Sequence, residues 1–210
     1  QGVLAPMVAD RSIEFFEAQF RREVAHEDVA LNSCEQAALP HLRGDVLDFG
    51  CGMGHLSVAA ARRGCHVVAL DASHTAIEHL RQRAAAEQLA IKAQVEDLRE
   101  YQVSESFDAI VTIGVLMCFD RPRALRCLGQ LQAQVRTGGV AVVNVLLEGT
   151  TYMDLLDPVG YCLFGRDELQ QRFGGWEILS AEYRDFDLPG NRIKSFITLI
   201  ARKPSATDAT

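Results

Sequence analysis

Three glycines, each separated from the next by one residue, stand where an apolar run gives way to a helix-like run. They are Gly50, Gly52 and Gly54, and Asp48 precedes them inside the apolar run. Glycine reaches left-handed backbone conformations and lets a ligand approach the bare peptide. The N–H groups that open the following helix favour anionic or polar ligand groups. The run therefore predicts a corner where a cofactor binds.

A second apolar run, 65–70, ends in Asp71. About twenty residues after the glycines is where a doubly wound fold places the carboxylate that accepts ribose hydroxyls. A dinucleotide fingerprint would also require a third glycine at position 55, where the chain has His55. The spacing thus favours a ribose-containing cofactor and disfavours nicotinamide or flavin chemistry. His55 opens the helix behind the turn, where it either contacts the ligands or, as is commoner, faces solvent.

Alternating apolar runs predict an α/β fold in which strands and helices follow one another. Helices are expected at about 11–23, 27–39, 54–63, 73–87, 121–135 and 166–173, and strands at 45–49, 66–70, 90–95, 107–113, 138–147, 177–186 and 192–202. We expect Thr137-Gly138-Gly139 to end the helix 121–135 at a glycine C-cap. Pro189-Gly190-Asn191 predicts the turn of a closing antiparallel hairpin.

The chain resembles the class I S-adenosylmethionine-dependent methyltransferases, because Asp48, the three glycines and Asp71 match that family in order and spacing. A further acid, Asp97, matches the family's acid after the third strand. The resemblance implies a Rossmann-like, doubly wound, mostly parallel seven-stranded sheet with a C-terminal antiparallel hairpin. It also implies S-adenosyl-L-methionine as the cofactor.

The same resemblance implies roles for individual residues. Asp48 would hold the glycine loop and the methionine amino group, Asp71 the ribose, and Asp97 the adenine amino group. The remaining cofactor-binding residues that it implies are Gly50, Cys51, Gly52, Gly54, Ala72, Leu98, Ile113 and Gly114.

Within that class, the chain resembles the TehB-type tellurite-resistance methyltransferases from about residue 34 to 203. The matching segments are 107–111, 115–119, 168–169, 175–177, 190–194, 196–198 and 201–203. That family is understood to methylate soft chalcogen oxyanions and related small nucleophiles, using an arginine in the final strand and a histidine followed by a basic residue in the preceding one. Arg192 matches the arginine, but Arg184 and Asp185 replace the other two.

Arg192 and Arg184 are the catalytic candidates. Facing each other across the hairpin, two guanidinium groups would suit a carboxylate or oxyanion; the alternative is an exposed pair neutralised by Asp185 and Asp187. Candidate substrate-pocket residues are Met117, Tyr152, Tyr161 and Phe164, although aromatic side chains more often belong to the core.

Four functional alternatives follow. The leading one is methyl transfer to a small soft nucleophile, a thiol, selenium or tellurium species, which needs no strong general base near neutral pH. The second is N- or O-methylation of a small molecule, for example an amino acid that carries a thiol or imidazole. A cofactor-binding regulator without catalysis is a more distant alternative, and so is a nicotinamide-dependent oxidoreductase.

Length and composition predict one methyltransferase domain over residues 1–203, with a disordered tail at 204–210. Apolar residues at helical spacing within 13–20 suggest that an N-terminal helical segment, about 1–40, forms a lid. The alternative is a helix packed permanently on the sheet edge.

The net charge of −7 argues against a nucleic-acid partner, since sequence-independent binding to a phosphate backbone needs a basic patch. No run has the length of a membrane span. Six scattered cysteines without a C-x-x-C pair, and histidines without metal-ligand spacing, predict no disulfide framework and no metal. We therefore expect a cytoplasmic protein, a monomer or homodimer, whose partner is a small-molecule methyl acceptor.

Overall fold

The computed structural model describes residues 11–24 and 30–205. The expected lid before residue 11, the start of the expected helix 27–39 and the tail beyond residue 205 lie outside these residues. No helix in the described ranges is long and apolar enough to cross a membrane.

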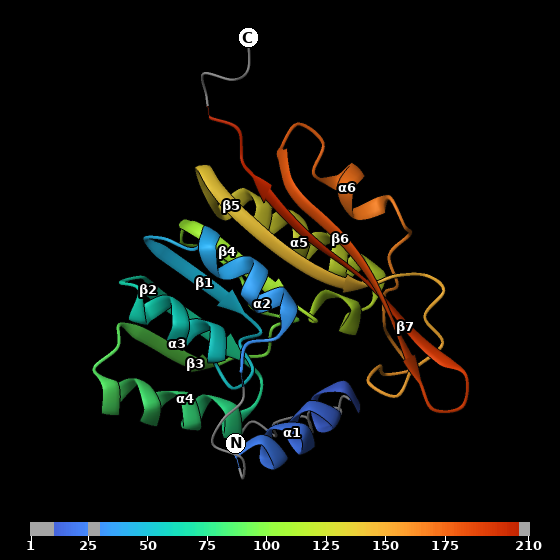
Figure 1. Cartoon of the computed structure of the whole chain (residues 1–210), viewed down its shortest axis with the longest axis horizontal. Helices are drawn as coiled ribbons and strands as arrows, with labels where there is room; N and C mark the ends of the chain where they lie inside the picture. The colour runs from blue at the N-terminus through green and yellow to red at the C-terminus, as the bar shows by residue number, and fades with distance from the viewer. Residues whose placement is uncertain (1–10, 25–29, 206–210) are drawn as a thin grey trace, which may run out of the picture.

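The described residues fold into a seven-stranded sheet with helices packed around it (Figure 1). The strands are β1 Asp45–Phe49, β2 His66–Asp71, β3 Ile91–Val95, β4 Phe107–Ile113, β5 Val135–Leu146, β6 Glu177–Leu188 and β7 Arg192–Arg202. The helices are α1 Arg11–Val24, α2 Ser33–Ala38, α3 His55–Arg62, α4 His74–Glu87, α5 Arg121–Gln134 and α6 Glu168–Arg172, with short 3-10 turns η1 Leu39–His41 and η2 Leu116–Cys118.

The sheet order is β3-β2-β1-β4-β5-β7-β6. The first five strands in this order are parallel to one another, whereas β7 runs antiparallel to both β5 and β6. This arrangement confirms the predicted fold class. It also brings the carboxyl ends of β1, β2 and β4 to one edge of the sheet, where an open α/β sheet binds ligands.

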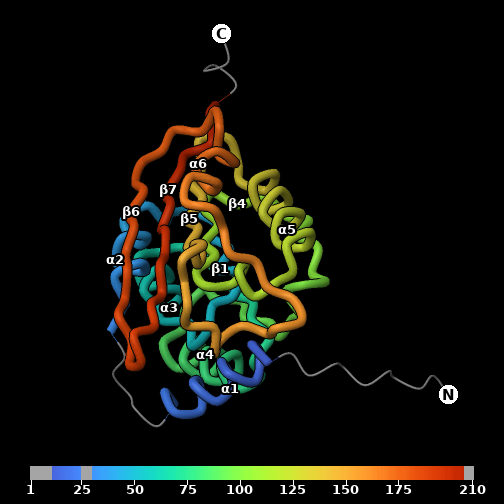
Figure 2. The backbone as a smooth tube through the Cα atoms, turned by 90° about the vertical axis from the view of Figure 1, so that its right-hand side faces the viewer, coloured from blue at the N-terminus to red at the C-terminus, as the bar shows by residue number. Residues whose placement is uncertain are grey.

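The two faces of the sheet carry separate apolar cores, because successive side chains on a strand point to opposite sides. On β1, Leu47 and Phe49 contribute to the core that α5 and α6 cover, while Val46 belongs to the core that α2, α3 and α4 cover. Figure 2 shows α2 and α3 on one side of the strands and α5 on the other. All three side chains are at most 1% exposed, so these strands are anchored from both sides.

The end of α5 corrects the expected glycine C-cap. The helix ends at Gln134, and Val135 is already extended as the first residue of β5, where it pairs with Phe107 of β4. Gly138, with φ +78°, lies inside β5, where the pairing between β4 and β5 shifts register. A side chain on Gly139 would place its Cβ 2.5 Å from the carbonyl oxygen of Asp108. The two glycines therefore serve a bulge and a close strand approach instead of a helix cap.

The N-terminus of α2 has a clear local cause. Asn32 accepts a hydrogen bond from the backbone N–H of Glu35 at 2.8 Å, and Glu35 accepts one in return from the backbone N–H of Asn32 at 3.1 Å. This capping box satisfies donors that a helix start leaves unpaired. It also turns the Glu35 side chain toward the carboxyl edge of the sheet.

A testable consequence concerns Lys203, whose ammonium donates to the carbonyl oxygens of Gln132 at 2.9 Å, Ala133 at 3.2 Å and Val135 at 2.8 Å. A cation at a helix C-terminus satisfies orphan carbonyls and opposes the helix dipole. We expect Lys203→Met to lower the free energy of unfolding in urea by about 1–2 kcal/mol.

The matched control for Lys203 is its neighbour Arg202, which makes only an exposed ion pair with Glu177 at 3.5 Å. Arg202→Met should change the stability by less than about 0.5 kcal/mol. Equal losses from the two variants would show that Lys203 acts by general charge and not as a cap.

Candidate cofactor-binding site

The glycine turn after β1 adopts the backbone that its sequence predicts. Gly50, Gly52 and Gly54 have φ of +84°, +54° and +78°. A Cβ on Gly50 would lie 2.2 Å from a methyl group of Val115. The N–H groups of Gly50 and Cys51 both donate to the carbonyl oxygen of Leu70, at 2.8 and 2.9 Å, which ties the turn to β2.

Asp71, at the end of β2, supports this turn. One of its carboxylate oxygens accepts from the N–H of Gly52 at 2.8 Å, and the other accepts from the N–H of Ser73 at 2.9 Å. Burial raises the pKa of Asp71, while these backbone hydrogen bonds oppose the rise. Ser73, and not Asp71, caps α4, because its hydroxyl accepts from the N–H of Ala76 at 3.0 Å.

Asp48 is the most deeply enclosed acid of the site, with 6% of its surface exposed. The hydroxyl of Ser57, on α3, donates to it at 2.6 Å. Burial raises the pKa of Asp48 to about 7, and the nearby carboxylates of Glu35 and Asp71 add to the rise against the Ser57 hydrogen bond. Near neutral pH, this carboxyl group is therefore close to half-ionised and responds to any cation placed beside it.

Asp97 follows β3 and holds a guanidinium group. Arg99 donates from Nε to one carboxylate oxygen at 3.1 Å and from Nη2 to the other at 3.2 Å. Burial alone would raise the pKa of Asp97, but the hydrogen bonds and charge of Arg99 lower it overall. Asp97 is thus an ionised acceptor at neutral pH, next to the buried side chain of Leu98.

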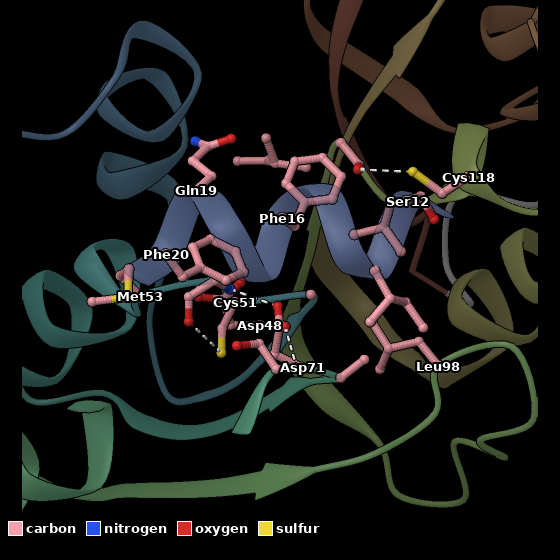
Figure 3. A pocket seen from close by; sticks show the side chains of 18 of the residues that line it. Ser12, Phe16, Gln19, Phe20, Asp48, Cys51, Met53, Asp71, Leu98 and Cys118 are labelled. Atoms are coloured by element: carbon pink, nitrogen blue, oxygen red, sulfur yellow. Dashed lines mark hydrogen bonds between the residues drawn. The ribbon is translucent and has the colours of Figure 1, made fainter. Parts of the chain in front are cut away.

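These groups surround one cavity of about 420 Å³ (Figure 3), within the size range of small-molecule sites. The predicted cofactor residues found along its wall are Asp48, Gly50, Cys51, Gly52, Asp71, Ala72, Asp97, Leu98, Ile113 and Gly114. Gly54 is not among the described residues that line the cavity. It is needed for packing, since a Cβ there would lie 2.5 Å from the side chain of Leu80.

Much of the remaining wall comes from residues that the sequence did not single out. They are Ser12, Glu23, Ala30, Asn32, Glu35, Met53, Leu56, Ser73 and Arg99. They join Ile13, Phe16, Gln19 and Phe20 from the expected lid, and Val115, Cys118 and Phe119 from the segment 115–119 that matches the TehB-type family. The apolar spacing of residues 13–20 could have indicated α1, but no local pattern indicates that Asn32 and Glu35 reach the cavity.

His55 also lines the cavity instead of facing solvent. Its Nε2 atom is sealed from solvent and finds no hydrogen-bond partner among the described residues. Burial lowers the pKa of His55, so the imidazole is neutral at physiological pH. It is consequently part of the wall without a positive charge of its own.

The two arginines proposed as catalytic do not meet. In the hairpin register Arg184 lies opposite Phe196, and Arg192 lies opposite Leu188, so the expectation that the guanidinium groups face each other is wrong. Arg192 forms an ion pair with Asp154 at 3.3 Å and sits 4.8 Å from the ring centre of Tyr152.

Arg184 pairs with Glu182 at 3.7 Å. Neither arginine belongs to the described cavity wall. In the sheet order, β4 and β5 lie between β1 and the β6–β7 hairpin, and this sideways position explains the separation (Figure 1).

The predicted substrate-pocket residues are also absent from the described residues that line the cavity. Met117 and Phe164 are buried in the core on the α5 side, at 2% and 0% exposed. Tyr152 lies beneath Arg192 and Lys194, and Tyr161 is 40% exposed. Along the described wall, apolar side chains near the end of β4 come instead from Val115, Cys118 and Phe119.

Comparison with known proteins agrees with this geometry. A family described as "Methyltransferase domain" matches residues 46–139, which span the glycine turn and the strands that hold the three acids. The chain is 28% identical over 197 residues to the "Probable S-adenosyl-L-methionine-dependent methyltransferase TehB" of Haemophilus influenzae strain 10810, covering 90% of this chain and 66% of TehB. The chain holds a methyltransferase domain at residues 46–139 and is similar to S-adenosylmethionine-dependent methyltransferases of the TehB kind.

Two further similarities accompany this one. The methyltransferase domain is 30% identical over 164 residues to "Hemagglutinin 1" of Eikenella corrodens, covering 75% of this chain and 54% of that protein. The crystal structure of TehB from Haemophilus influenzae shares the fold, with a TM-score of 0.72 and 24% identity over 90% of this chain and 67% of that one. The chain thus spans between about half and two thirds of the length of these curated relatives.

The residues of the cavity fit S-adenosyl-L-methionine, the cofactor of this class. A sulfonium and an ammonium group give this molecule positive charge at one end, where Asp48, Glu23 and Glu35 line the wall. Bare peptide at Gly50 and Gly52 permits close approach, and Asp71 and Asp97 present acceptors for hydroxyl and amino hydrogens. Among the residues described, no group of three His, Cys, Asp or Glu side chains could hold a metal ion.

Proposed function

We propose that this methyltransferase domain methylates a small soft nucleophile, a thiol or a selenium or tellurium species. The observation that carries the proposal is the single cavity in which Asp48, Asp71 and Asp97, from the ends of adjacent strands, surround the bare glycine turn. When bound, S-adenosyl-L-methionine supplies a methyl group activated by a positively charged sulfur.

The chain's own residues would bind and orient this cofactor. Asp71 would accept the ribose hydroxyls while keeping its backbone hydrogen bonds to the glycine turn. Asp97 would accept from the adenine amino group, with Leu98 packed beside the ring. Asp48, which Ser57 holds in place, would receive the ammonium group.

The acceptor side is apolar where β4 ends. Val115, Cys118 and Phe119 line it from the η2 turn after β4, and Ile13 and Phe16 line it from α1. These side chains exclude water and restrict the acceptor's orientation, and such alignment contributes about 7–11 kcal/mol to well-oriented reactions. A soft acceptor needs no strong base there, because its thiolate or selenolate is already nucleophilic near neutral pH.

The charge of the cavity wall further restricts the chemical class of the acceptor. Carboxylates outnumber basic side chains along the described wall, where Arg99 is already paired with Asp97 and His55 is neutral. A negative cavity favours a neutral or cationic acceptor over an oxyanion. Within the leading class, Glu23 and Glu35 therefore favour a thiol or selenol that enters in its neutral form over a chalcogen oxyanion, and they also keep a small-molecule amine as the second candidate.

The experiment that tests this function is calorimetric titration of the protein with S-adenosyl-L-methionine and S-adenosylhomocysteine. Methyl-transfer assays follow with small thiols, selenite, tellurite, and amino acids that carry a thiol or imidazole. Turnover on thiols or chalcogens supports the proposal, and turnover confined to nitrogen selects the amine alternative. Cofactor binding without any turnover would support a regulator, and no binding would overturn the cofactor assignment.

Substitution of the hairpin arginines tests whether Arg192 has the role that the family resemblance implies. Because Arg192 is held by Asp154 and Tyr152 outside the described wall, we expect Arg192→Ala to leave the cofactor Kd and the acceptor KM within about twofold of wild type. Arg184→Ala, which removes a second hairpin arginine, should behave alike. A selective rise in acceptor KM for Arg192→Ala alone would restore the role that the family resemblance implies.

A further inference from the structure

Helix α1 lies over the cavity and contributes side chains to its wall. Figure 3 shows it crossing the pocket, with Phe20 beside Cys51 and Asp48. Phe16 and Gln19 of the same helix also line the cavity. The ring of Phe20 rests on the glycine turn, because a Cβ on Gly52 would lie 3.2 Å from a ring carbon. The helix thus contacts the backbone against which the cofactor would lie.

Two kinds of contact hold α1 in this position. The first is a small apolar cluster of Phe16, Phe20, Met53 and Ala76, and Phe16 also packs with Phe15 against the core on the α5 side. A 14-residue helix is marginal alone in water, so this docking sustains it.

The second contact is polar. The carboxylate of Glu17 accepts hydrogen bonds from the hydroxyls of Ser73 and Thr75, at the N-terminus of α4. Burial alone would raise the pKa of Glu17, but these hydroxyl hydrogen bonds and the charge of Arg21 lower it. Glu17 is therefore an ionised acceptor near neutral pH, where charge-assisted hydrogen bonds are the stronger kind.

The polar contact continues to the cofactor site through Ser73. This residue is 4% exposed, and each of its polar groups has a different partner. Its hydroxyl donates to Glu17 and accepts from Ala76 at 3.0 Å, while its N–H donates to Asp71 at 2.9 Å. Asp71 in turn accepts from Gly52 at 2.8 Å. A continuous hydrogen-bonded chain thus joins the covering helix to the glycine turn.

We propose that Glu17 is a positioning residue that, through Ser73, holds Asp71 in place for the cofactor and latches α1 over the loaded cavity. The inference rests on the proposed function, since it concerns the same cofactor. Preorganising Asp71 should favour binding because the carboxylate need not be ordered when the ligand arrives. Latching α1 should slow dissociation because the covering helix must undock before the ligand leaves.

The test follows the dissociation rate of S-adenosylhomocysteine by stopped-flow displacement. We expect Glu17→Ala to raise this rate about tenfold and Glu17→Gln, which keeps one acceptor oxygen, to raise it about threefold, equivalent to about 1.4 and 0.7 kcal/mol. Glu14→Ala is the matched control, because Glu14 is an exposed acid on the same helix. The Glu14→Ala variant should release the ligand at the wild-type rate.

A double-mutant cycle tests the contact of Glu17 with the start of α4. Thr75→Val removes one hydroxyl of the latch with little change in shape, and it should raise the dissociation rate by itself. In the double variant Glu17→Ala/Thr75→Val, the dissociation rate should rise by less than the product of the two single increases, because both substitutions remove the same contact. Hydrogen exchange at residues 11–24 should slow on ligand binding in wild type and less so in Glu17→Ala.

The outcomes separate this inference from the function on which it rests. If wild type binds the ligand and Glu17→Ala, folded by circular dichroism, releases it at the wild-type rate, the latch is wrong and the cofactor assignment stands. Equal acceleration by Glu14→Ala would likewise overturn it, as a general charge effect. If wild type binds no ligand, the proposed function itself fails.

Discussion

Replacing Asp71 with alanine is expected to weaken S-adenosyl-L-methionine binding about 30- to 150-fold, because a hydrogen bond to a charged group contributes about 2–3 kcal/mol. The structure adds a second cause to the lost ribose contact. Asp71 also accepts from the N–H groups of Gly52 and Ser73. Alanine would leave both donors without this partner and loosen the glycine turn.

The two causes can be separated by calorimetry on three variants. Asp71→Asn keeps the side-chain volume and one acceptor oxygen, so it should retain more affinity than Asp71→Ala. Glu78→Ala removes an exposed acid from the neighbouring helix α4 and should bind like wild type. Asp71→Ala with wild-type affinity and intact folding would remove Asp71 from the cofactor site.

Raising the pH from 6 to 8 is expected to tighten cofactor binding about tenfold, through Asp48. Burial, supported by the charges of Glu35 and Asp71, raises the pKa of Asp48 to about 7. The carboxyl group is therefore mostly protonated at pH 6 and mostly ionised at pH 8. An ammonium group binds the ionised form, so binding at pH 6 must release a proton and binding at pH 8 need not.

Asp48→Asn should abolish most of this pH dependence and weaken binding at pH 8 by about 2–3 kcal/mol. Titrations in two buffers of different ionisation enthalpy measure the released proton directly. A wild-type affinity that stays constant from pH 6 to 8 would contradict the role of Asp48. So would an Asp48→Asn variant that keeps the wild-type pH profile.

The same pKa bears on the stability of the protein without ligand. In the folded chain the pKa of Asp48 lies above its ordinary value of 3.8, so the folded state holds a proton that the unfolded state has lost. The stability from this group is complete below pH 3.8 and declines as the pH rises through about 7. Asp48→Asn should therefore stabilise the free protein at pH 8, as thermal unfolding would show, while it harms cofactor binding.

The amino-acid sequence by itself determined the fold class and the cofactor corner. Gly50, Gly52 and Gly54 could be assigned to left-handed backbone because nothing else suits a turn between a buried strand and a helix. Asp71 could be assigned to the same site because parallel strands all end at one edge of the sheet. Both arguments need only local spacing and the geometry of a doubly wound sheet. Asp97 was assigned to the site through the resemblance to the methyltransferase class.

Contacts between segments distant in sequence were decided by tertiary structure alone. The pairing of Arg192 with Asp154, and the contribution of Glu35 to the cavity wall, depend on how a hairpin and a short helix pack, which periodicity does not encode. The start of β5 at Val135 was missed because Gly138 and Gly139 resemble a helix end, although a neighbouring strand pairs across them. The link from Glu17 through Ser73 to Asp71 exists only because docking brings α1 onto α4, since side chains far apart in the chain become partners through packing and not through spacing.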